Sequence, residues 1–337
     1  MSVSEFAEDE LIFLPLGGSG EIGMNMNLYG IGGKWLLVDL GITFADGEHP
    51  GIDIITPDPT YLEERRDDLL GLVITHAHED HLGAVAHLWP RLRCPVWATP
   101  FAAALLRNKL EEAGLLGQVP LHVLEPGERL DIGPFDIDFI GLTHSTLEMN
   151  ALAIRTSAGL VLHTGDWKWD PDPLVGPTSD QEALRRLGDE GVMALIGDST
   201  NALNEGTSGS ELDVRNKLME ICANRTGRIA VATFASNVAR IDTVARVAAA
   251  HDRHLVLVGR SLWRIVAAAQ ECGYLNDLPP FLKDVEGAYL PPDKVMFLCT
   301  GCQGEQRAAM GRIAFGDHRH VTFEKGDLVI FSSRVIP

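Results

Sequence analysis

The chain has 337 residues, 45% of them hydrophobic and 22% charged, as in a globular protein with room for two domains. Its formal net charge is −19, from 28 basic and 47 acidic residues, which argues against indiscriminate nucleic-acid binding through a basic surface. No apolar run approaches the ~18 residues of a membrane span, and the acidic segment Met1 to Glu10 lacks the features of a signal peptide.

The cysteines are odd in number and mostly lie in apolar segments: Cys94, Cys222, Cys272, Cys299 and Cys302. This usage indicates reduced thiols and a cytoplasmic setting. Cys299 and Cys302 have CxxC spacing, but the sequence has no second such pair to complete a zinc site.

The first predicted strand, Leu11 to Leu16, runs into a glycine-rich segment. Three of its glycines have the G-x-G-x-x-G spacing of dinucleotide-binding sites: Gly18, Gly20 and Gly23. That fingerprint requires a helix immediately afterwards. Here residues 24–29 alternate like a strand and lead through a glycine hairpin to another strand, Trp35 to Asp39. We therefore expect the glycines to let the backbone come close to a metal-binding face.

Asp39 ends its strand and precedes Gly41. A carboxylate there is suited to orienting a metal-ligand histidine, or it caps the turn on its own account. A charged helix is predicted from Tyr61 to Leu70, and the apolar run Leu72 to Ile74 predicts a short buried strand after it.

Directly after that strand comes the sequence THAHEDH, Thr75 to His81. Imidazole and carboxylate groups are ligands suited to Zn²⁺ or a similar transition ion. Because side chains alternate along extended backbone, His76 and His78 point the same way and can bind one ion. Asp80 and His81 follow the turn and can reach a second ion nearby. The alternative, a polar loop with accidental histidines, is disfavoured by the density of ligand residues.

Beyond this segment the pattern predicts helices and strands in turn: helix 82–88, strand 95–98, helix 101–113, and hairpin-like strands 121–124 and 135–142. His144 comes directly after the second of these strands. A further strand is predicted at 159–163, and Asp166 lies in the turn that follows it. A lone histidine at such a position usually belongs to a core or a turn. Together with the cluster at 76–81, His144 and Asp166 become candidate ligands.

A capping box at Ser179 to Glu182 predicts a helix to Leu187. A strand is predicted at 192–196, and a further carboxylate, Asp198, lies just after it. Residues 201–210 then shift to Gly, Ser, Thr and Asn, which is typical of a linker.

After the linker, helices and strands alternate: helix 211–224, strand 228–233, helix 238–250, strand 254–258, helix 262–273, strand 294–299, helix 305–313 and strand 328–331. Such alternation predicts a parallel α/β sheet, whose ligands bind at the carboxyl ends of the strands. Residues there are suited to a phosphate group, although ordinary loop chemistry explains them equally well: Ser236, Asn237, Arg260 and Ser261.

The order Asp39, HxHxDH, Thr143-His144 and Thr164-Gly165-Asp166 resembles the metallo-β-lactamase superfamily. Four further stretches narrow the likeness to ribonuclease J: residues 16–25 (LGGSGEIGMN), 232–237 (ATFASN), 300–305 (TGCQGE) and 332–337 (SSRVIP). Residues 197–200 (GDST) are similar to the first motif of the β-CASP nucleases. The resemblance covers essentially the whole chain.

The resemblance implies an α/β fold: a metallo-β-lactamase αββα sandwich with an inserted β-CASP parallel α/β domain. Residues 1–204 would form the N-terminal portion of the metallo-β-lactamase domain, and residues 205–337 the β-CASP domain. In this family the chain continues beyond the position of Pro337. The closing lactamase elements, a last metal-ligand histidine and a C-terminal domain would therefore be absent here, with weak metal retention and little activity expected if the polypeptide truly ends there.

Carried over by position, one metal ion would be held by His76, His78 and His144, and a second by Asp80 and His81, with Asp166 bridging. The ions would be two Zn²⁺, with Mn²⁺ as the alternative. The resemblance further implies catalytic roles for Asp80, Asp166 and Asp198, an orienting role for Asp39, and RNA phosphate contacts for the four residues at the strand ends. Asp198 would position the nucleophile or protonate the leaving oxygen.

The implied function is that of a metal-dependent ribonuclease, a 5′-to-3′ exonuclease and endonuclease acting in the cytoplasm in rRNA processing and mRNA decay. Its expected partners are single-stranded RNA with a 5′-monophosphate, further copies in a homodimer or higher oligomer, and an RNA-degradation complex, but no membrane. Three alternatives stay open. They are a DNA-directed β-CASP nuclease, a glyoxalase-type metallohydrolase that leaves the α/β segment unexplained, and a non-catalytic RNA-degradation subunit that need not keep the full ligand set.

Overall fold

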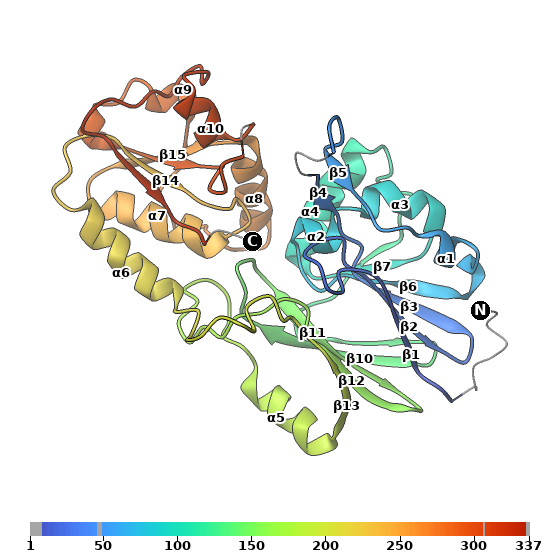
Figure 1. The fold of residues 1–337 in the computed structure, drawn as a ribbon. Helices are drawn as coiled ribbons and strands as arrows, with labels where there is room; N and C mark the ends of the chain where they lie inside the picture. The colour runs from blue at the N-terminus through green and yellow to red at the C-terminus, as the bar shows by residue number, and fades with distance from the viewer. Residues whose placement is uncertain (1–8, 46–48, 306, 335–337) are drawn as a thin grey trace. The chain divides into compact units, whose positions relative to one another are not determined.

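The structure is a computed structural model that describes residues 9–45, 49–305 and 307–334 (Figure 1). Three predicted features lie partly outside these residues: the acidic N-terminal segment, the helix expected from Glu305, which includes Gln306, and the closing motif 332–337. Packing divides the chain into two compact units. Unit 1 comprises Met1–Trp169 and Pro177–Ser208, and unit 2 comprises Asp170–Gly176 and Gly209–Pro337.

The first sheet of unit 1 has the strand order β1-β2-β3-β6-β7-β8. Its strands are β1 (Ile12–Gly17), β2 (Met26–Ile31), β3 (Lys34–Val38), β6 (Leu69–Val73), β7 (Val96–Ala98) and β8 (Leu121–Val123). The first three strands are antiparallel, whereas β3, β6, β7 and β8 run parallel. Residues that follow β3 and β6 therefore emerge side by side at one edge of the sheet. A separate small ribbon pairs β4 (Thr43–Phe44) with β5 (Ile54–Ile55).

The second sheet of unit 1 has the order β13-β12-β11-β10-β9. Its strands are β9 (Arg129–Ile132), β10 (Phe135–Leu142), β11 (Met149–Thr156), β12 (Gly159–His163) and β13 (Val192–Ile196). Its inner face shares one apolar core with the first sheet, as the packing of Tyr29 and Val73 with Phe139 and Ile154 illustrates. Burial of the two inner faces in this shared core is the main driving force for the packing of one sheet on the other.

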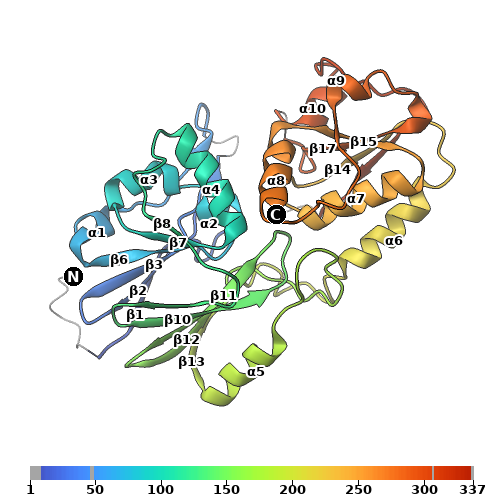
Figure 2. The ribbon, with the colours of Figure 1, turned by 180° about the vertical axis from the view of Figure 1, so that it is seen from behind.

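Helices cover the outer faces of both sheets (Figures 1 and 2). On the first sheet lie α1 (Thr60–Glu63), α2 (Glu79–Leu82), α3 (Val85–Leu92) and α4 (Pro100–Glu112). On the second lies α5 (Gln181–Glu190), whose Ala183 and Leu187 pack against Ile140 and Met149. The layers are thus helix, sheet, sheet, helix, which confirms the predicted sandwich.

Some local predictions for unit 1 are wrong. The helix expected from Tyr61 to Leu70 is broken, because a 3₁₀ turn covers Arg66–Asp68 and Leu69 pairs with Trp35 in the sheet. The segments 121–124 and 135–142 are not a hairpin, because β8 and β10 belong to different sheets. The partners of β10, which are β9 and β11, were not predicted.

The start of α5 also differs from the predicted capping box. Asp180 is the N-cap, and its carboxylate accepts a hydrogen bond from the Ala183 amide at 2.9 Å. Ser179 instead contacts Thr143, whose amide donates to the serine hydroxyl at 2.9 Å. Ser179 thereby braces the turn that carries the neighbouring His144.

Unit 2 is a parallel sheet with the order β16-β15-β17-β14-β18, as the alternating pattern predicts. Its strands are β14 (Ile229–Ala232), β15 (His254–Val258), β16 (Leu282–Lys283), β17 (Val295–Cys299) and β18 (Leu328–Phe331). Its helices are α6 (Glu211–Cys222), α7 (Val238–Ala250), α8 (Arg260–Glu271), α9 (Asp284–Gly287), α10 (Ala309–Ala314) and the 3₁₀ turn Pro292–Lys294.

Three details of unit 2 depart from expectation. The helix predicted from Glu305 begins only at Ala309, α8 begins two residues early at Arg260, and β16 with α9 was not predicted. All five cysteines are free thiols, and burial raises the pKa of Cys299 to about 12. Across the described ranges, none of the helices combines the length and apolar character that crossing a membrane demands.

Candidate metal centre

The HxHxDH segment leaves the first sheet at the end of β6. His78 is extended, with φ −73° and ψ 152°, and α2 begins at the next residue. The loop after β3 holds α2 in place, because Leu40 N donates to His81 O at 2.7 Å and Ile42 N donates to Glu79 O at 3.0 Å. Two neighbouring strand ends thus fix the position of the ligand-rich segment.

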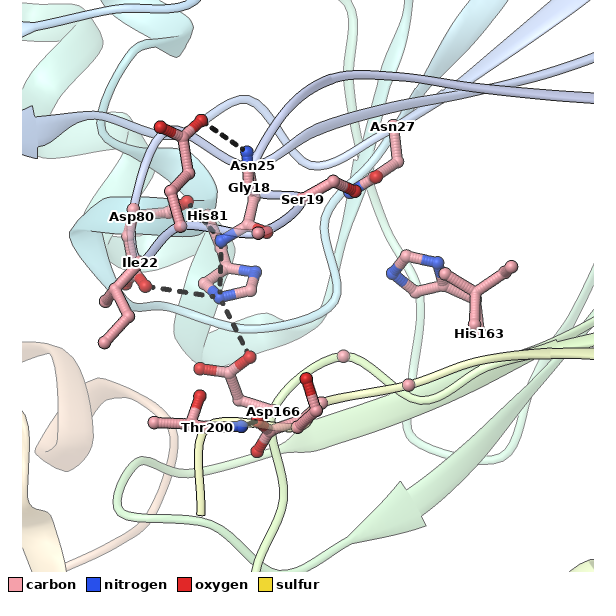
Figure 3. Close-up of a pocket in the computed structure, with 18 residues that line it drawn as sticks. Gly18, Ser19, Ile22, Asn25, Asn27, Asp80, His81, His163, Asp166 and Thr200 are labelled. Atoms are coloured by element: carbon pink, nitrogen blue, oxygen red, sulfur yellow. Dashed lines mark hydrogen bonds and ion pairs between the residues drawn. The ribbon is translucent and has the colours of Figure 1, made fainter. Parts of the chain in front are cut away.

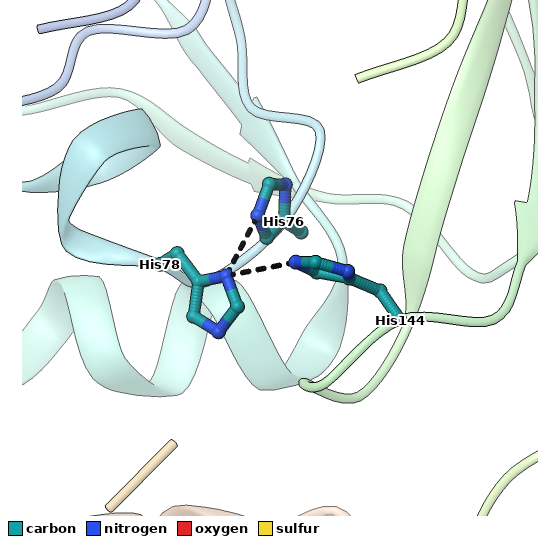
Figure 4. Close-up of side chains that lie close together, drawn as sticks. All are labelled: His76, His78 and His144. Carbon is teal, nitrogen blue, oxygen red and sulfur yellow. Dashed lines mark hydrogen bonds between the residues drawn. The ribbon is translucent and has the colours of Figure 1, made fainter. Parts of the chain in front are cut away.

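One group of three histidines converges at this edge (Figure 4). Nδ1 of His78 lies 3.1 Å from Nε2 of His76 and 3.1 Å from Nε2 of His144. The three residues offer one nitrogen each within 4.8 Å of one another, although His144 comes from the other sheet of the sandwich. Such convergence of ring nitrogens is the geometry of a shared ligand site.

Electrostatics keep these three imidazoles neutral. Burial, together with the neighbouring histidines, lowers the pKa of His76 well below its usual value. Burial likewise lowers the pKa of His78, and it lowers the pKa of His144 to about 3. A histidine must be neutral to bind a metal ion, so the group is in its ligand form at neutral pH.

A second group gathers around His81 (Figure 3). Nε2 of His81 lies 3.4 Å from a carboxylate oxygen of Asp166 and 3.6 Å from one of Asp80. His81, Asp166 and His76 also offer ligand atoms within 4.8 Å of one another. His76 therefore lies in both groups, and Asp80 lies beside the second.

The charges in the second group oppose each other. Burial would lower the pKa of His81, but the carboxylates of Asp39, Asp80 and Asp166 together raise it well above its ordinary value. Burial would raise the pKa of Asp166, but the charge and hydrogen bond of His81 hold it well below its ordinary value. Without a metal ion, the protonated imidazole carries the positive charge that these carboxylates attract; a bound cation would take over that role and displace the proton.

Asp39 links the two strand ends beneath the site. Its side chain is fully buried and accepts hydrogen bonds from the amide and the hydroxyl of Thr75, both at 2.8 Å. It also contacts Nδ1 of His81 at 2.7 Å, which leaves Nε2 to face Asp166. The residue has a positive φ of 61°, as in a turn, and its side chain contacts Thr75 and His81.

A pocket of about 410 Å³ opens beside the second group. One wall is the glycine-rich loop, residues 18–23, and another holds Asp80, His81 and Asp166. Asp198 lines the same pocket, and its carboxylate accepts a hydrogen bond from the Thr200 amide at 2.7 Å. The glycines therefore lie at the same pocket as the ligand-rich segment.

Two residues at the pocket were not predicted. The side-chain amide of Asn25 lies 3.2 Å from Nε2 of His81 and donates to the Asp80 carbonyl at 3.0 Å. His163, the last residue of β12, lines the pocket three residues before Asp166. A histidine at a strand end was the signal for His144, and the same signal could have found His163.

The predicted phosphate contacts lie in unit 2. Asn237 is the N-cap of α7, and its side chain accepts from the Arg240 amide at 2.9 Å. Ser236 precedes it, while Arg260 and Ser261 form the exposed start of α8. These residues follow β14 and β15, which are separated in the sheet by β17.

Comparisons with known proteins agree with this geometry. A family model described as the metallo-beta-lactamase superfamily matches residues 20–190, just over half of the chain. A second model, described as "Ribonuclease J, beta-CASP domain", matches residues 226–337. Among solved structures, a protein of unknown function from Enterococcus faecalis V583 has a TM-score of 0.57 at 14% identity. That likeness covers 86% of this chain and 77% of the other, and it concerns the fold alone.

Curated relatives carry the same family name. The chain is 47% identical over 334 residues to ribonuclease J of Sinorhizobium meliloti, which covers 98% of this chain and 59% of that protein. It is 41% identical over 326 residues to ribonuclease J of Mycolicibacterium smegmatis, and this match covers 96% of this chain and 58% of that protein. The chain thus spans somewhat more than half the length of these relatives. The chain belongs to the metallo-β-lactamase superfamily, and its residues 226–337 are similar to the β-CASP domain of ribonuclease J.

Proposed function

We propose that this protein is a metal-dependent ribonuclease that cleaves single-stranded RNA. The observation that carries the proposal is the pair of ligand groups that share His76, one of neutral imidazoles and one of imidazole with carboxylate. The relatives named ribonuclease J, together with the β-CASP match, favour RNA cleavage over the three alternative functions. The proposed activity is 5′-to-3′ exonuclease and endonuclease cleavage, with preference for a 5′-monophosphate, in rRNA processing and mRNA decay in the cytoplasm.

The donor set fits two divalent transition ions. His76, His78 and His144 would hold one ion, while Asp80 and His81 would hold the other, with Asp166 between them. Zn²⁺ accepts such nitrogen and oxygen ligands, and Mn²⁺ is the alternative. When bound, the ions would supply Lewis acidity at the scissile phosphate.

The residues of the chain would then orient the reaction. Asp39 holds the Nδ1 side of His81 at 2.7 Å and so keeps Nε2 directed at the ligand group. Asp198 would position the attacking water or give a proton to the leaving oxygen, because its carboxylate lines the pocket. Hydrolysis would leave a 3′-hydroxyl and a 5′-phosphate on the downstream RNA.

RNA binding would involve the second unit. We assign phosphate contacts to Ser236, Asn237, Arg260 and Ser261, which lie at the ends of parallel strands where ligands commonly bind. We also assign residues 1–204 to the metallo-β-lactamase domain and 205–337 to the β-CASP domain. Assembly as a homodimer or higher oligomer, and association with an RNA-degradation complex, belong to the same proposal.

The test is digestion of single-stranded RNA that carries a labelled 5′-monophosphate, in the presence of Zn²⁺ or Mn²⁺. Immediate release of labelled mononucleotide is expected for a 5′ exonuclease, and discrete longer fragments for an endonuclease. His76→Ala and Asp166→Ala should abolish both, because each removes a ligand. The matched control is His87→Ala, an exposed histidine on α3. Cleavage that survives both ligand substitutions would rule out the proposed site, and equal cleavage of DNA would favour the DNA-directed alternative.

A further inference from the structure

A buried tyrosine–histidine pair joins the two sheets beside the pocket. The hydroxyl of Tyr29, on β2, lies 2.9 Å from Nδ1 of His163, at the end of β12. Tyr29 is fully buried, and His163 is 5% exposed. Their rings meet edge to face, with centroids 6.0 Å apart. The pair thus holds the imidazole in one orientation.

The direction of this hydrogen bond follows from the tyrosine. Burial, together with the charge of Asp39, raises the pKa of Tyr29, so the phenol keeps its proton. Among the residues that the structure describes, His163 is the one hydrogen-bond partner of that hydroxyl. Leaving a buried O–H without an acceptor costs about 1–3 kcal/mol. Tyr29 therefore donates to Nδ1, and the proton of the neutral imidazole is on Nε2.

His163 is also uncharged at neutral pH. Burial lowers its pKa to about 4, although the carboxylates of Asp39 and Asp166 work in the opposite direction. The ring thus presents a neutral Nε2–H donor, whose direction is set by the contact to Tyr29.

That donor is directed at the pocket. His163 lines it, and Figure 3 shows its ring across from His81 and Asp166. Within the described part of the chain, no hydrogen bond joins Nε2 to another residue, and His163 lines the pocket.

The chemistry of the wall indicates which group the donor meets. The pocket is lined by four carboxylates, Glu21, Asp80, Asp166 and Asp198, and by no lysine or arginine among the described residues. Away from the ligand groups, this wall does not attract a second phosphate. A neutral N–H donor there suits a neutral oxygen acceptor.

We propose that His163 binds the nucleoside next to the scissile phosphate, through a hydrogen bond from Nε2–H to a ribose hydroxyl or a base carbonyl. This assignment rests on the proposed ribonuclease function. It makes His163 a substrate-binding residue held in its working tautomer by Tyr29.

The tautomer can be measured without any activity. In chelator-treated protein with ¹⁵N-labelled histidine, long-range ¹H–¹⁵N correlation distinguishes the two neutral forms, and loss of the signal in His163→Gln assigns it. We expect the Nε2–H form in the unmodified protein and a mixture of both forms in Tyr29→Phe. An Nδ1–H form in the unmodified protein would overturn the inference.

Kinetics then test the contact. His163→Leu should raise KM for an oligoribonucleotide about 5–10-fold, the usual size for one neutral hydrogen bond, with kcat and metal content nearly unchanged. His163→Gln keeps an N–H near the position of Nε2, so its KM should stay within about 3-fold of that of the unmodified protein. The matched control is His251→Leu, because His251 contacts the Met219 carbonyl in unit 2. An unchanged KM in His163→Leu, or a loss explained by a lower melting temperature, would refute the contact.

The substrate identifies the acceptor and separates the two proposals. If His163→Leu raises KM for RNA but not for DNA of the same sequence, the acceptor is the 2′-hydroxyl. If it raises KM for both, the acceptor is a base carbonyl. If the unmodified protein cleaves no RNA, the proposed function fails, and titration with uridine 5′-monophosphate then decides. A shift of the His163 Nε2 signal would support nucleotide binding at this wall, and no shift would reject it.

Discussion

Asp39 and His81 form a buried pair in which the carboxylate lies 2.7 Å from Nδ1 of the imidazole. The two residues come from neighbouring parallel strands, since Asp39 follows β3 and His81 follows β6 by way of α2. The pair therefore depends on the strand register, and it fixes which nitrogen of His81 is offered to a metal ion.

Replacing Asp39 by Asn should weaken metal binding. The amide oxygen can still accept from the Thr75 N–H, but the side chain no longer fixes the tautomer of His81 or adds negative charge, so we expect a roughly 10–100-fold loss of metal affinity. Competition against a chromophoric chelator measures it. Asp131→Asn, at an exposed carboxylate whose side chain is 79% accessible, is the control and should bind normally. Equal affinities would contradict an orienting role for Asp39.

Replacing Gly41 by Ala should displace α2. A Cβ at Gly41 would lie 1.7 Å from the Asp80 carbonyl oxygen and 2.7 Å from the His81 amide, and both of these are backbone groups. We expect lower metal affinity and a loss of roughly 1–3 kcal/mol in unfolding free energy. Denaturant titration checks it against Gly188→Ala, a position inside α5 with open space around it, which should gain about 0.5–1 kcal/mol. Similar stability of the two variants would refute the steric argument.

The local sequence predicted most residues of the site, but not the contacts between residues far apart in the chain. His76, His78, Asp80 and His81 are dense within one short segment, so their proximity follows from backbone geometry alone. The contact of His163 with Tyr29 joins two sheets and depends on the packing of the sandwich, which no local pattern encodes.

The same distinction explains the fold. Strict strand–helix alternation predicted the parallel sheet of unit 2, because that pattern is local and repeated. The helix expected from Tyr61 to Leu70 failed because Leu69 gains more from pairing with Trp35 in the sheet than charged neighbours gain from a helix. The apparent hairpin failed because spacing does not reveal that β8 and β10 lie in different sheets.

The metal-free protein should be most stable at about pH 7, just above the unfolded histidine pKa. His144 and His163 have folded pKa values of about 3 and about 4, below the unfolded value near 6.5, so the unfolded state binds more protons in acid. Each group should lose about 1.5 kcal/mol of stability between pH 6.5 and 5. His81 has a raised folded pKa, so its contribution is full below about pH 6.5 and is lost as pH rises through the folded value.

Urea unfolding of chelator-treated protein from pH 5 to 9 tests this expectation. His163→Gln should flatten the acid side of the curve, whereas His87→Gln, at an exposed histidine, should leave it unchanged. A stability that still rises above about pH 8 would contradict the assigned direction of the His81 shift.

Breaking the Glu211–Arg240 pair should destabilise unit 2. Arg240 Nη2 lies 3.1 Å from the Glu211 carboxylate, and the two side chains are only 9% and 6% exposed. Arg240→Met removes the positive partner of this buried carboxylate and should lower the unfolding free energy by about 3–5 kcal/mol. Lys217→Met breaks an exposed pair with Glu220 and should cost less than about 1 kcal/mol.

Arg240 also donates to the Ser332 carbonyl just after β18, so the loss of stability in Arg240→Met should appear as earlier hydrogen exchange in β18 than in β9 of unit 1. Equal unfolding free energies for the two variants would show that the buried pair is not needed for stability.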